Sequence, residues 1–497
     1  MKLNKIAASC ALAMAAMSSQ AFALTAFDTP DLDVYLSGAS APQNILNGVA
    51  AALFDAGYFT FYDDAGTPST FDSNDGKAYR AYFGIVKAGN GTLSGKKVIL
   101  QDRAKGGSVW GVDPVARKQG IANMNVSAAS CVANTVNPAT YAYACAERGD
   151  DTSHSTALPN RVPDFGVSDV EPNMFKFPYN VEPGASQLSA AEAATLTNFG
   201  TNAVMFGVPV SASVPATTYI SKAALGAMLT GDVQDWTLVD ATAAPAGGTQ
   251  VVVCRRVQGS GTQASYNNLF SHFPCENGSI SGTGTIPPSV AGDSASVVLG
   301  TATGTGTVAD PIILNPADGY TVVEGSASGN VRSCLQGAQY GNKTHDAVNG
   351  VAPLTFQGGT DGKYYKIDFG NGGYGAVGVL SMDSAGQENG WSFRNLDGVA
   401  PTKANMLAAK YDFVMEQSMQ YRTDTPAGLK KDFMDLFITK AGDPVILNGI
   451  SSTGVRNSVA AVPVNFTPVV DATGAVTNNV MVGTRYGNSC RPIRKQY

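Results

Sequence analysis

The chain has 497 residues, of which 44% are hydrophobic, so its length allows two or three domains with packed cores. Only 14% of the residues are charged, the formal net charge is −6, and no basic run occurs, which argues against nucleic acids and anionic membrane surfaces as partners. The 55 glycines and 25 prolines favour a fold with many loops and strands over a helical bundle.

The N-terminus has the pattern of a cleavable signal peptide. Lys2 and Lys5 precede an apolar stretch from Ile6 to Met17, and Ala21-Phe22-Ala23 then supplies the small residues that a signal peptidase reads. The apolar stretch is shorter than the roughly 20 residues that cross a bilayer. We therefore expect a signal at 1–23, cleavage near Ala23-Leu24, and a periplasmic or secreted protein without a membrane span in the mature chain.

The cysteines fit an exported protein. Six remain once Cys10 is removed with the signal: Cys131, Cys145, Cys254, Cys275, Cys334 and Cys490. An even number in an exported chain indicates up to three disulfides. Cys131 and Cys145 enclose a small loop and form the one pair that the spacing favours, while the remaining pairings stay open. No Cys-x-x-Cys occurs, so a redox or zinc role has little support.

Strands and helices alternate in the first part of the chain. We expect a strand at 34–36, a helix with its apolar face at 45–53, a strand at 97–100, a further helix after Gly106-Gly107-Ser108, and a buried stretch at 162–166. This order predicts an α/β fold rather than a sandwich.

A second unit begins at the apolar strand 204–210. A helix at 219–229, strands at 251–253, 374–382 and 411–421, and a helix at 428–438 follow. The segment from Gly278 to Pro311 consists mainly of Gly, Ser, Thr, Ala and Val without a helical period, and we expect an inserted hairpin or loop there.

The strongest chemical signal lies between Arg255 and Thr262. The strand at 251–253 leads into two arginines, and a Gly-Ser-Gly-Thr turn then opens a helix. A helix N-terminus presents unpaired N–H groups, glycine allows close backbone approach, and an arginine offers a bidentate fork for an oxyanion. The alternative for this loop taken alone is a capped helix beside a solvated arginine.

Two distant segments add to this loop. Gly38-Ala39-Ser40-Ala41-Pro42 is another strand-to-helix turn, and Asp164-Phe165-Gly166-Val167-Ser168-Asp169 places an acid after a buried stretch. With Arg255 to Thr262, and with weaker framework matches at 207–210, 229–236 and 375–379, the chain resembles the periplasmic phosphate-binding receptors of phosphate ABC import systems.

The resemblance implies a two-lobed α/β fold of the type II periplasmic binding proteins, in which each lobe is a mixed sheet flanked by helices. Lobe one would comprise 24–203 plus 415–497, and lobe two 204–414 with the inserted loop 278–311. Large insertions, at 63–95 and 120–159 as well as 278–311, would extend loops that dock a partner or line the cleft.

The resemblance also implies roles for single residues. Ser40 would supply a hydroxyl, Ala41 and Gly261 backbone N–H groups, Ser260 and Thr262 further hydroxyls, and Arg256 the paired charge, while Arg255 points away. Asp169 would accept a hydrogen bond from a protonated phosphate oxygen; from the residues alone, a helix N-cap is the alternative. The family's turn after its second strand is replaced here, so Ser108 is expected to supply the hydroxyl, with Lys105 as the alternative. Gln258 stands where the family often has an acid that orients the arginine.

The implied function is capture of inorganic phosphate, or a similar protonated tetrahedral oxyanion, by hinge closure of an interlobe cleft. We expect a monomer without cofactor or metal that delivers its ligand to an ABC permease. The alternative is a secreted or cell-surface protein of the same fold with a structural or scavenging role. An enzyme is not expected, because His154, His272 and His345 fall in no metal or nucleophile–base pattern.

Overall fold

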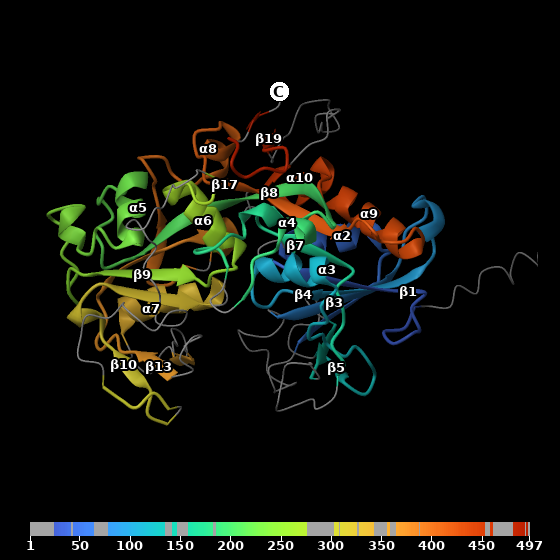
Figure 1. Ribbon diagram of the computed structural model, residues 1–497, viewed down its shortest axis with the longest axis horizontal. Helices are drawn as coiled ribbons and strands as arrows, with labels where there is room; N and C mark the ends of the chain where they lie inside the picture. The colour runs from blue at the N-terminus through green and yellow to red at the C-terminus, as the bar shows by residue number, and fades with distance from the viewer. Residues whose placement is uncertain are drawn as a thin grey trace, which may run out of the picture.

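A computed structural model describes residues 24–40, 43–63, 78–134, 142–146, 158–181, 185–275, 303–307, 309–325, 328–341, 355–357, 364–386, 388–452, 458–460, 481–492 and 494–495. The predicted signal at 1–23 lies outside these residues, as does Ala41. The α/β class is confirmed, since a large mixed sheet is flanked by helices. Two halves share the long strands β8 (Leu196–Ser211) and β17 (Val414–Arg422), which run antiparallel to each other (Figure 1).

The first half is built around three parallel strands. β1 (Leu32–Gly38) pairs with β4 (Lys97–Arg103) on one side and β7 (Phe165–Ser168) on the other. Their carboxyl ends therefore meet at one edge of the sheet. β3 (Tyr79–Ile85) lies antiparallel along β4, and β2 (Phe59–Asp63) along β3. The segment 63–95, predicted as an insertion, thus contributes a full strand to the main sheet.

Two helices cover one face of this sheet. α2 (Gln43–Leu53) and α9 (Leu429–Ala441) pack against it, and α10 (Pro444–Ser452) packs beside α2. Ile45, Leu46, Val49 and Leu53 are buried at the helical spacing expected of a core-facing stripe. Together with alternate residues of the strands they form one hydrophobic core.

The second half has its own core around β9 (Val251–Arg256). β9 lies between β11 (Thr321–Gly325) and β14 (Gly375–Gly378), parallel to both. α5 (Lys222–Thr230) and α6 (Gly261–Ser271) lie on one side of these strands and α7 (Ser328–Tyr340) on the other (Figure 1). With both faces covered, β9 is buried along its whole length, which explains its unbroken apolar start.

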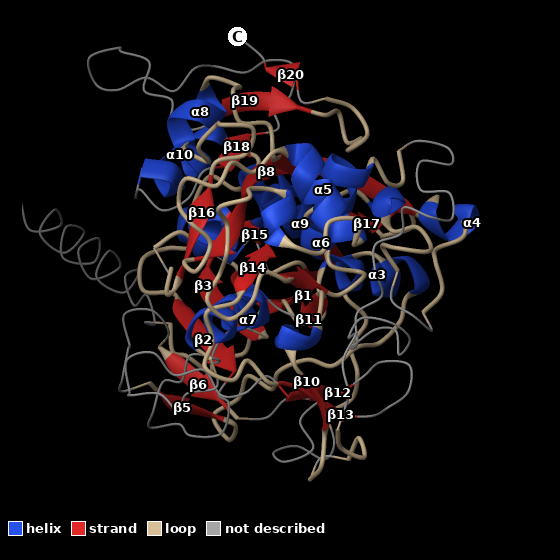
Figure 2. Cartoon of the chain, turned by 90° about the vertical axis from the view of Figure 1, so that its left-hand side faces the viewer, coloured by secondary structure: helices blue, strands red, loops and turns tan. Residues whose placement is uncertain are grey.

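Shorter elements complete the described structure. They are α3 (Asp113–Arg117), α4 (Ala190–Ala193), α8 (Lys403–Leu407), β5 (Cys131–Ala133), β6 (Tyr143–Cys145), β10 (Ile312–Leu314), β12 (Thr355–Gln357), β13 (Tyr364–Ile367), β15 (Leu380–Ser381), β16 (Trp391–Arg394), β18 (Ser458–Ala460), β19 (Met481–Thr484) and β20 (Arg494–Lys495). The small sheet β10-β13-β12 and the pair β5–β6 lie at the same end of the molecule in both views (Figures 1 and 2).

Most of the predicted elements are present, with two differences. The helix expected after Gly106-Gly107-Ser108 is a 3-10 turn at Ser108–Gly111 followed by the short α3. Pro114 lies in the first turn of α3, and the helix ends at Lys118, which has a left-handed backbone conformation. The strand expected at 374–382 is divided into β14 and β15, and a 3-10 turn begins at Met382. Most of the predicted insertion 278–311 lies outside the described residues.

The six cysteines after residue 23 form three disulfides. The predicted bond Cys131–Cys145 is confirmed, and it joins paired positions of β5 and β6. Cys254–Cys334 ties β9 to α7. Cys275–Cys490 connects the segment after α6 to the C-terminal segment.

Candidate functional site

The two arginines at the end of β9 point to opposite sides of the strand. Arg255 forms a buried ion pair with Glu324, with 3.0 Å between its Nη2 and Oε2 of the carboxylate. The alternation of side chains along a strand sends Arg256 to the other side, and its Cα partner is Gly325 on β11. The orientation of Arg255 away from the loop is therefore as predicted.

Arg256 is buried, and its side chain is held by the last residue of β11 and the first residue of α7. Its Nε donates to the Gly325 carbonyl at 3.2 Å, and Nη1 donates to Ser328 Oγ at 3.3 Å. Burial lowers the pKa of Arg256 to about 10, while the charge of Asp169 acts in the opposite direction. The guanidinium therefore stays charged at neutral pH, and the Asp169 charge favours this charged form.

The Gly-Ser-Gly-Thr turn opens α6 as predicted. Gly259 has a φ of +87°, a conformation that favours glycine. Ser260 occupies the N-cap position but makes no side-chain capping bond, which leaves the N–H groups of the first turn of this 11-residue helix to other acceptors. The turn also meets the first half of the molecule, because the Val109 N–H donates to the Gly259 carbonyl at 2.9 Å.

Asp169 follows β7 and is the carboxylate of this cluster. Its Oδ2 accepts from Thr262 Oγ1 at 3.3 Å, and its Oδ1 accepts from Gln417 Nε2 at 2.9 Å. The backbone N–H of Asp169 donates to Ser108 Oγ at 3.2 Å. Burial raises the pKa of Asp169, although Gln417, the Arg256 charge and the two hydroxyls act to lower it. Asp169 therefore holds a proton more tightly than an ordinary aspartate does.

Gly261 lets the two halves come close together. A Cβ at this position would meet Ser108 Oγ and would lie 2.7 Å from the Asp169 Cβ. The start of α6 therefore packs directly on the Ser108–Asp169 pair, and only a glycine fits there without displacing it.

The structure brings most of the predicted site residues into one buried cluster. They come from segments far apart in the sequence: Ser108, Asp169, Arg256, Ser260, Gly261 and Thr262. Ser40 is half-buried just beyond the end of β1, where the N–H of its neighbour Ala39 donates to the Val167 carbonyl. Of the two candidates on the second turn, Ser108 is buried against Asp169 and the Lys105 side chain is exposed.

Sequence reasoning missed two residues of the cluster. Gln417 lies 248 positions after Asp169 and donates to it, and Ser328 accepts from Arg256. A signal for Gln417 exists in the sequence, since Glu416, Gln417, Ser418 and Gln420 are polar residues within a strand that is buried. A polar run of this kind in a core strand indicates internal hydrogen bonding rather than solvent contact.

Gln258 and Asp164 take structural roles. With its amide nitrogen oriented toward the carbonyls of Pro178 and Val181, Gln258 donates to both, at 3.1 and 2.6 Å. Asp164 accepts from the Tyr35 N–H and from Lys430 Nζ at 2.9 Å each. Gln258 therefore joins the loop to the segment after Asp169, and Asp164 fixes the start of β7.

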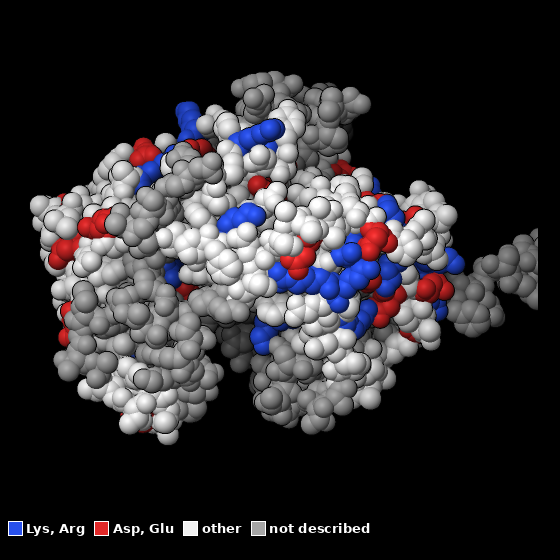
Figure 3. Space-filling view, in the orientation of Figure 1, with Lys and Arg blue, Asp and Glu red and all other residues white. Residues whose placement is uncertain are grey.

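The charged surface residues are mixed rather than of one sign. On the face shown in Figure 3, basic and acidic side chains gather together over the first half, whereas the described surface of the second half is mostly uncharged. Ion pairs in the first half include Lys97–Asp28, Arg161–Asp33 and Lys430–Asp164. An anion would therefore be attracted by the local donors of the cluster and not by a broad positive field.

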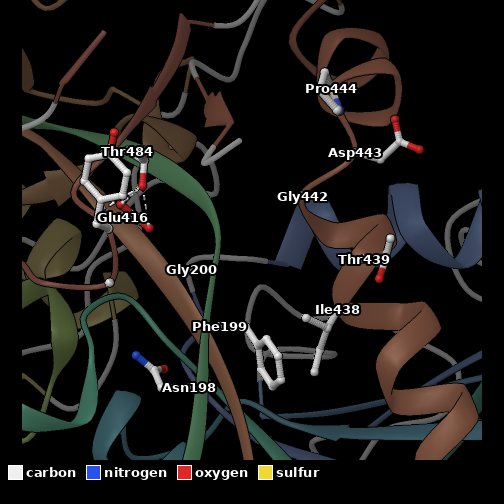
Figure 4. Close-up of a pocket in the computed structure, with 12 residues that line it drawn as sticks. Asn198, Phe199, Gly200, Glu416, Ile438, Thr439, Gly442, Asp443, Pro444 and Thr484 are labelled. Carbon is white, nitrogen blue, oxygen red and sulfur yellow. Dashed lines mark hydrogen bonds between the residues drawn. The ribbon is translucent and has the colours of Figure 1, made fainter. Parts of the chain in front are cut away.

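A separate cavity of about 720 Å³ lies between β8, the end of α9 and residues 484–487 (Figure 4). Glu416, Asp443, Phe199 and Ile438 contribute to its lining. Glu416 is held by Thr484 Oγ1 at 3.1 Å, as Figure 4 shows, and burial raises its pKa. Its lining is acidic and apolar and includes no residue of the Arg256–Asp169 cluster.

Metal and membrane signals were also sought. Within the residues that the structure describes, no group of three His, Cys, Asp or Glu side chains is arranged to hold a metal ion. In the same part of the chain, no helix is long and apolar enough to cross a membrane.

Comparisons with known proteins were made at the level of sequence and of fold. No protein-family model and no curated protein sequence matches the chain. Among solved structures, the chain is similar to a high-affinity periplasmic phosphate-binding protein, PfluDING, bound with phosphate (13% identity, 85% of this chain and 90% of that one, TM-score 0.39). It is also similar to the ancestral soluble variant of the human phosphate binding protein (12% identity, 85% of this chain and 90% of that one, TM-score 0.38). A third similar structure is PstS from Borrelia burgdorferi (11% identity, 85% of this chain and 97% of that one, TM-score 0.34).

Proposed function

We propose that this chain is an exported binding protein that captures inorganic phosphate between two lobes. The observation that carries the proposal is the hydrogen bond from Thr262 to Asp169, which joins segments 93 residues apart and places the anion-binding turn against a buried carboxylate that faces Arg256. Such a site combines two kinds of group. A positive charge, hydroxyls and helix N–H groups lie on one side, and a hydrogen-bond acceptor lies on the other.

The donors favour an oxyanion and the carboxylate favours a protonated one. Arg256, the hydroxyls of Ser260 and Thr262 and the N-terminus of α6 can donate to tetrahedral oxygens. A carboxylate such as Asp169 repels the lone pairs of fully deprotonated sulfate but accepts from the hydroxyl of monohydrogen or dihydrogen phosphate. Each hydrogen bond to a charged group contributes roughly 1.5–3 kcal/mol, so four or five support micromolar or tighter binding.

The proposed lobes are 24–203 plus 415–497 and 204–414. Each half has its own hydrophobic core, and β8 and β17 pass from one half to the other. The direct contacts of Thr262 with Asp169 and of Val109 with Gly259 belong to a closed arrangement. An anion that accepts hydrogen bonds from one lobe and donates one to Asp169 on the other would stabilise the closed form, because only that form makes all of these hydrogen bonds. Delivery to an ABC permease for uptake is the role that such a closed complex would serve.

Titration calorimetry of the oxidised protein with phosphate, arsenate and sulfate tests the proposal. We expect saturable heat with phosphate at a Kd of micromolar or below, a similar Kd for arsenate, and binding of sulfate at least a hundredfold weaker. Absence of phosphate binding by folded protein would refute the receptor role and favour a secreted protein with a structural role.

A further inference from the structure

We propose that Ser328 is a positioning residue that sets the direction of the Arg256 guanidinium before the anion arrives. The inference rests on the proposed function, in which Arg256 supplies the charge. Ser328 lies 72 residues after Arg256 in the sequence and in no segment that the sequence motifs cover.

The sheet brings Ser328 to the site. β11 runs parallel to β9, and Gly325, its last residue, is the Cα partner of Arg256. Gly325 and Arg256 therefore lie side by side at the edge of the sheet where both strands end. Ser328 is the first residue of α7, so its hydroxyl stands at the point where Arg256 leaves its strand.

Two acceptors hold different atoms of one rigid group. Gly325 accepts from Nε at 3.2 Å and Ser328 from Nη1 at 3.3 Å. Because the guanidinium is planar, a bond at each of these atoms fixes both the rotation and the tilt of the plane. The backbone carbonyl is set by the β9–β11 pairing, whereas the Ser328 hydroxyl is an acceptor that a substitution can remove.

The neighbouring arginine shows what is distinct about this arrangement. Arg255 is held by Glu324, whose carboxylate offsets its charge. Arg256 is held by Gly325 and Ser328, which are both neutral acceptors. The chain thus pairs one arginine with a carboxylate and holds the guanidinium of the next one by two neutral acceptors.

Gln258 does not orient Arg256 in this way. Its amide donates to the carbonyls of Pro178 and Val181, on the segment that follows Asp169. Ser328 and Gly325 therefore provide the orientation from the opposite strand. Holding a long side chain in its bound geometry reduces the ordering cost of binding, and loss of the hydroxyl should weaken affinity for phosphate.

The test compares phosphate Kd, by calorimetry, for Ser328→Ala, Ser328→Thr and a matched control. We expect about tenfold weaker binding for Ser328→Ala and recovery to within about threefold of wild type for Ser328→Thr, which keeps the hydroxyl. The control is Ser384→Ala, since Ser384 Oγ accepts from Nη1 of Arg332 at 3.2 Å on the same helix α7. The control removes the same kind of bond away from the loop and should leave the Kd unchanged.

A double-mutant cycle separates positioning from a general effect on the fold. In an Arg256→Lys background, Ser328→Ala should change the Kd less than twofold, because the planar group that it orients is absent. Equal losses in both backgrounds, or a wild-type Kd in Ser328→Ala, would overturn the role of Ser328. If the wild-type protein binds no phosphate, the proposed function is refuted. If wild type and Ser328→Ala bind phosphate equally well, only the role of Ser328 is refuted.

Discussion

Arg255 and Arg256 are adjacent residues with separate tasks. Arg255 belongs to a buried ion pair with Glu324, and removal of one partner from such a pair leaves an uncompensated charge that costs about 3–5 kcal/mol. The charge of Asp169 acts on Arg256, and the backbone N–H of Arg256 donates to Gln263 in α6. Arg255 therefore supports the fold, and in the proposed function Arg256 binds the ligand.

This division predicts opposite phenotypes for two alanine variants. Arg256→Ala should abolish phosphate binding in calorimetry, because it removes the charge of the site. Arg255→Ala should lower the midpoint of thermal unfolding while the protein that remains folded binds phosphate within about threefold of wild type. Arg255→Lys, which keeps the charge, serves if the alanine variant does not fold, and similar losses of affinity at both positions would contradict the assignment.

In the proposed function, Asp169 would determine which anion is accepted. In Asp169→Asn the amide can donate to an oxygen that carries no proton, so sulfate should compete with phosphate at comparable concentrations. Competition calorimetry measures this change. Asp164→Asn is the matched control, because Asp164 bonds Tyr35 and Lys430 instead of the cluster. An unchanged preference for phosphate over sulfate in Asp169→Asn would rule out the acceptor role.

The single residues differ in how far sequence predicts them. Arg256 and Thr262 stand out because charge, glycine and hydroxyl occur together in one short loop. Ser328 carries no local pattern, and the polar run around Gln417 indicates internal hydrogen bonding but not the partner. Each reaches the cluster through strand pairing between distant segments. Predicting such residues requires the register of β17 with β7 and of β11 with β9.

At the scale of elements, the edge where parallel strands end is what assembles the site. Asp169 follows β7, Ser108 follows β4, and the end of β11 and the start of α7 hold Arg256. The alternation of apolar strands and helices in the sequence predicts this edge. It does not predict that β3 completes the sheet beside β4, because the chain around β3 matches no framework segment of the resembled family.

β4 also carries a buried acid that the site does not use. Both carboxyl oxygens of Asp102 are buried without a hydrogen-bond partner, and Leu36 and Arg80 stand opposite on the neighbouring strands. Burial raises the pKa of Asp102 to about 7, against the charges of Arg80 and Arg103. The folded protein therefore binds a proton at this residue more tightly than the unfolded chain does.

This proton makes the stability depend on pH. Between the ordinary pKa of an aspartate, about 4, and about 7, the folded state holds more protons, so the free energy of unfolding falls as pH rises through this window. Asp102→Asn should lack this contribution and be more stable than wild type at pH 8, by at most roughly 4 kcal/mol, with little difference at pH 4. Urea unfolding of both proteins at several pH values measures this; parallel curves would show that Asp102 does not titrate in the window.

At the scale of the whole molecule, α6 is fastened at both ends to one short segment. Thr262, at its start, bonds Asp169. At its other end, Cys275 is bonded to Cys490, and the neighbouring Ser489 N–H donates to Glu171 at 2.8 Å. Asn267, between the two ends, donates to Asn180 at 2.7 Å. If the proposed lobes open between Thr262 and Asp169, they do so against a covalent tether.

Removing that tether should affect both stability and ligand exchange. The Cys275–Cys490 bond spans 215 residues and the Cys131–Cys145 bond 14, and loop-closure entropy makes the longer bond worth roughly 2 kcal/mol more. The double variant Cys275→Ser/Cys490→Ser should unfold at lower urea and release phosphate several-fold faster in stopped-flow displacement. Cys131→Ser/Cys145→Ser is the control and should keep the wild-type release rate; equal release rates in both variants would show that the tether does not limit opening.

If residues of both halves bind one protonated oxyanion, a crystal structure of the protein grown with phosphate will contain one phosphate with oxygens within hydrogen-bond distance of Arg256, Thr262 and the start of α6. One further phosphate oxygen will lie within hydrogen-bond distance of an Asp169 carboxylate oxygen. A phosphate bound elsewhere, such as in the cavity beside Glu416, with the Arg256–Asp169 cluster unchanged, would refute shared binding by the two halves.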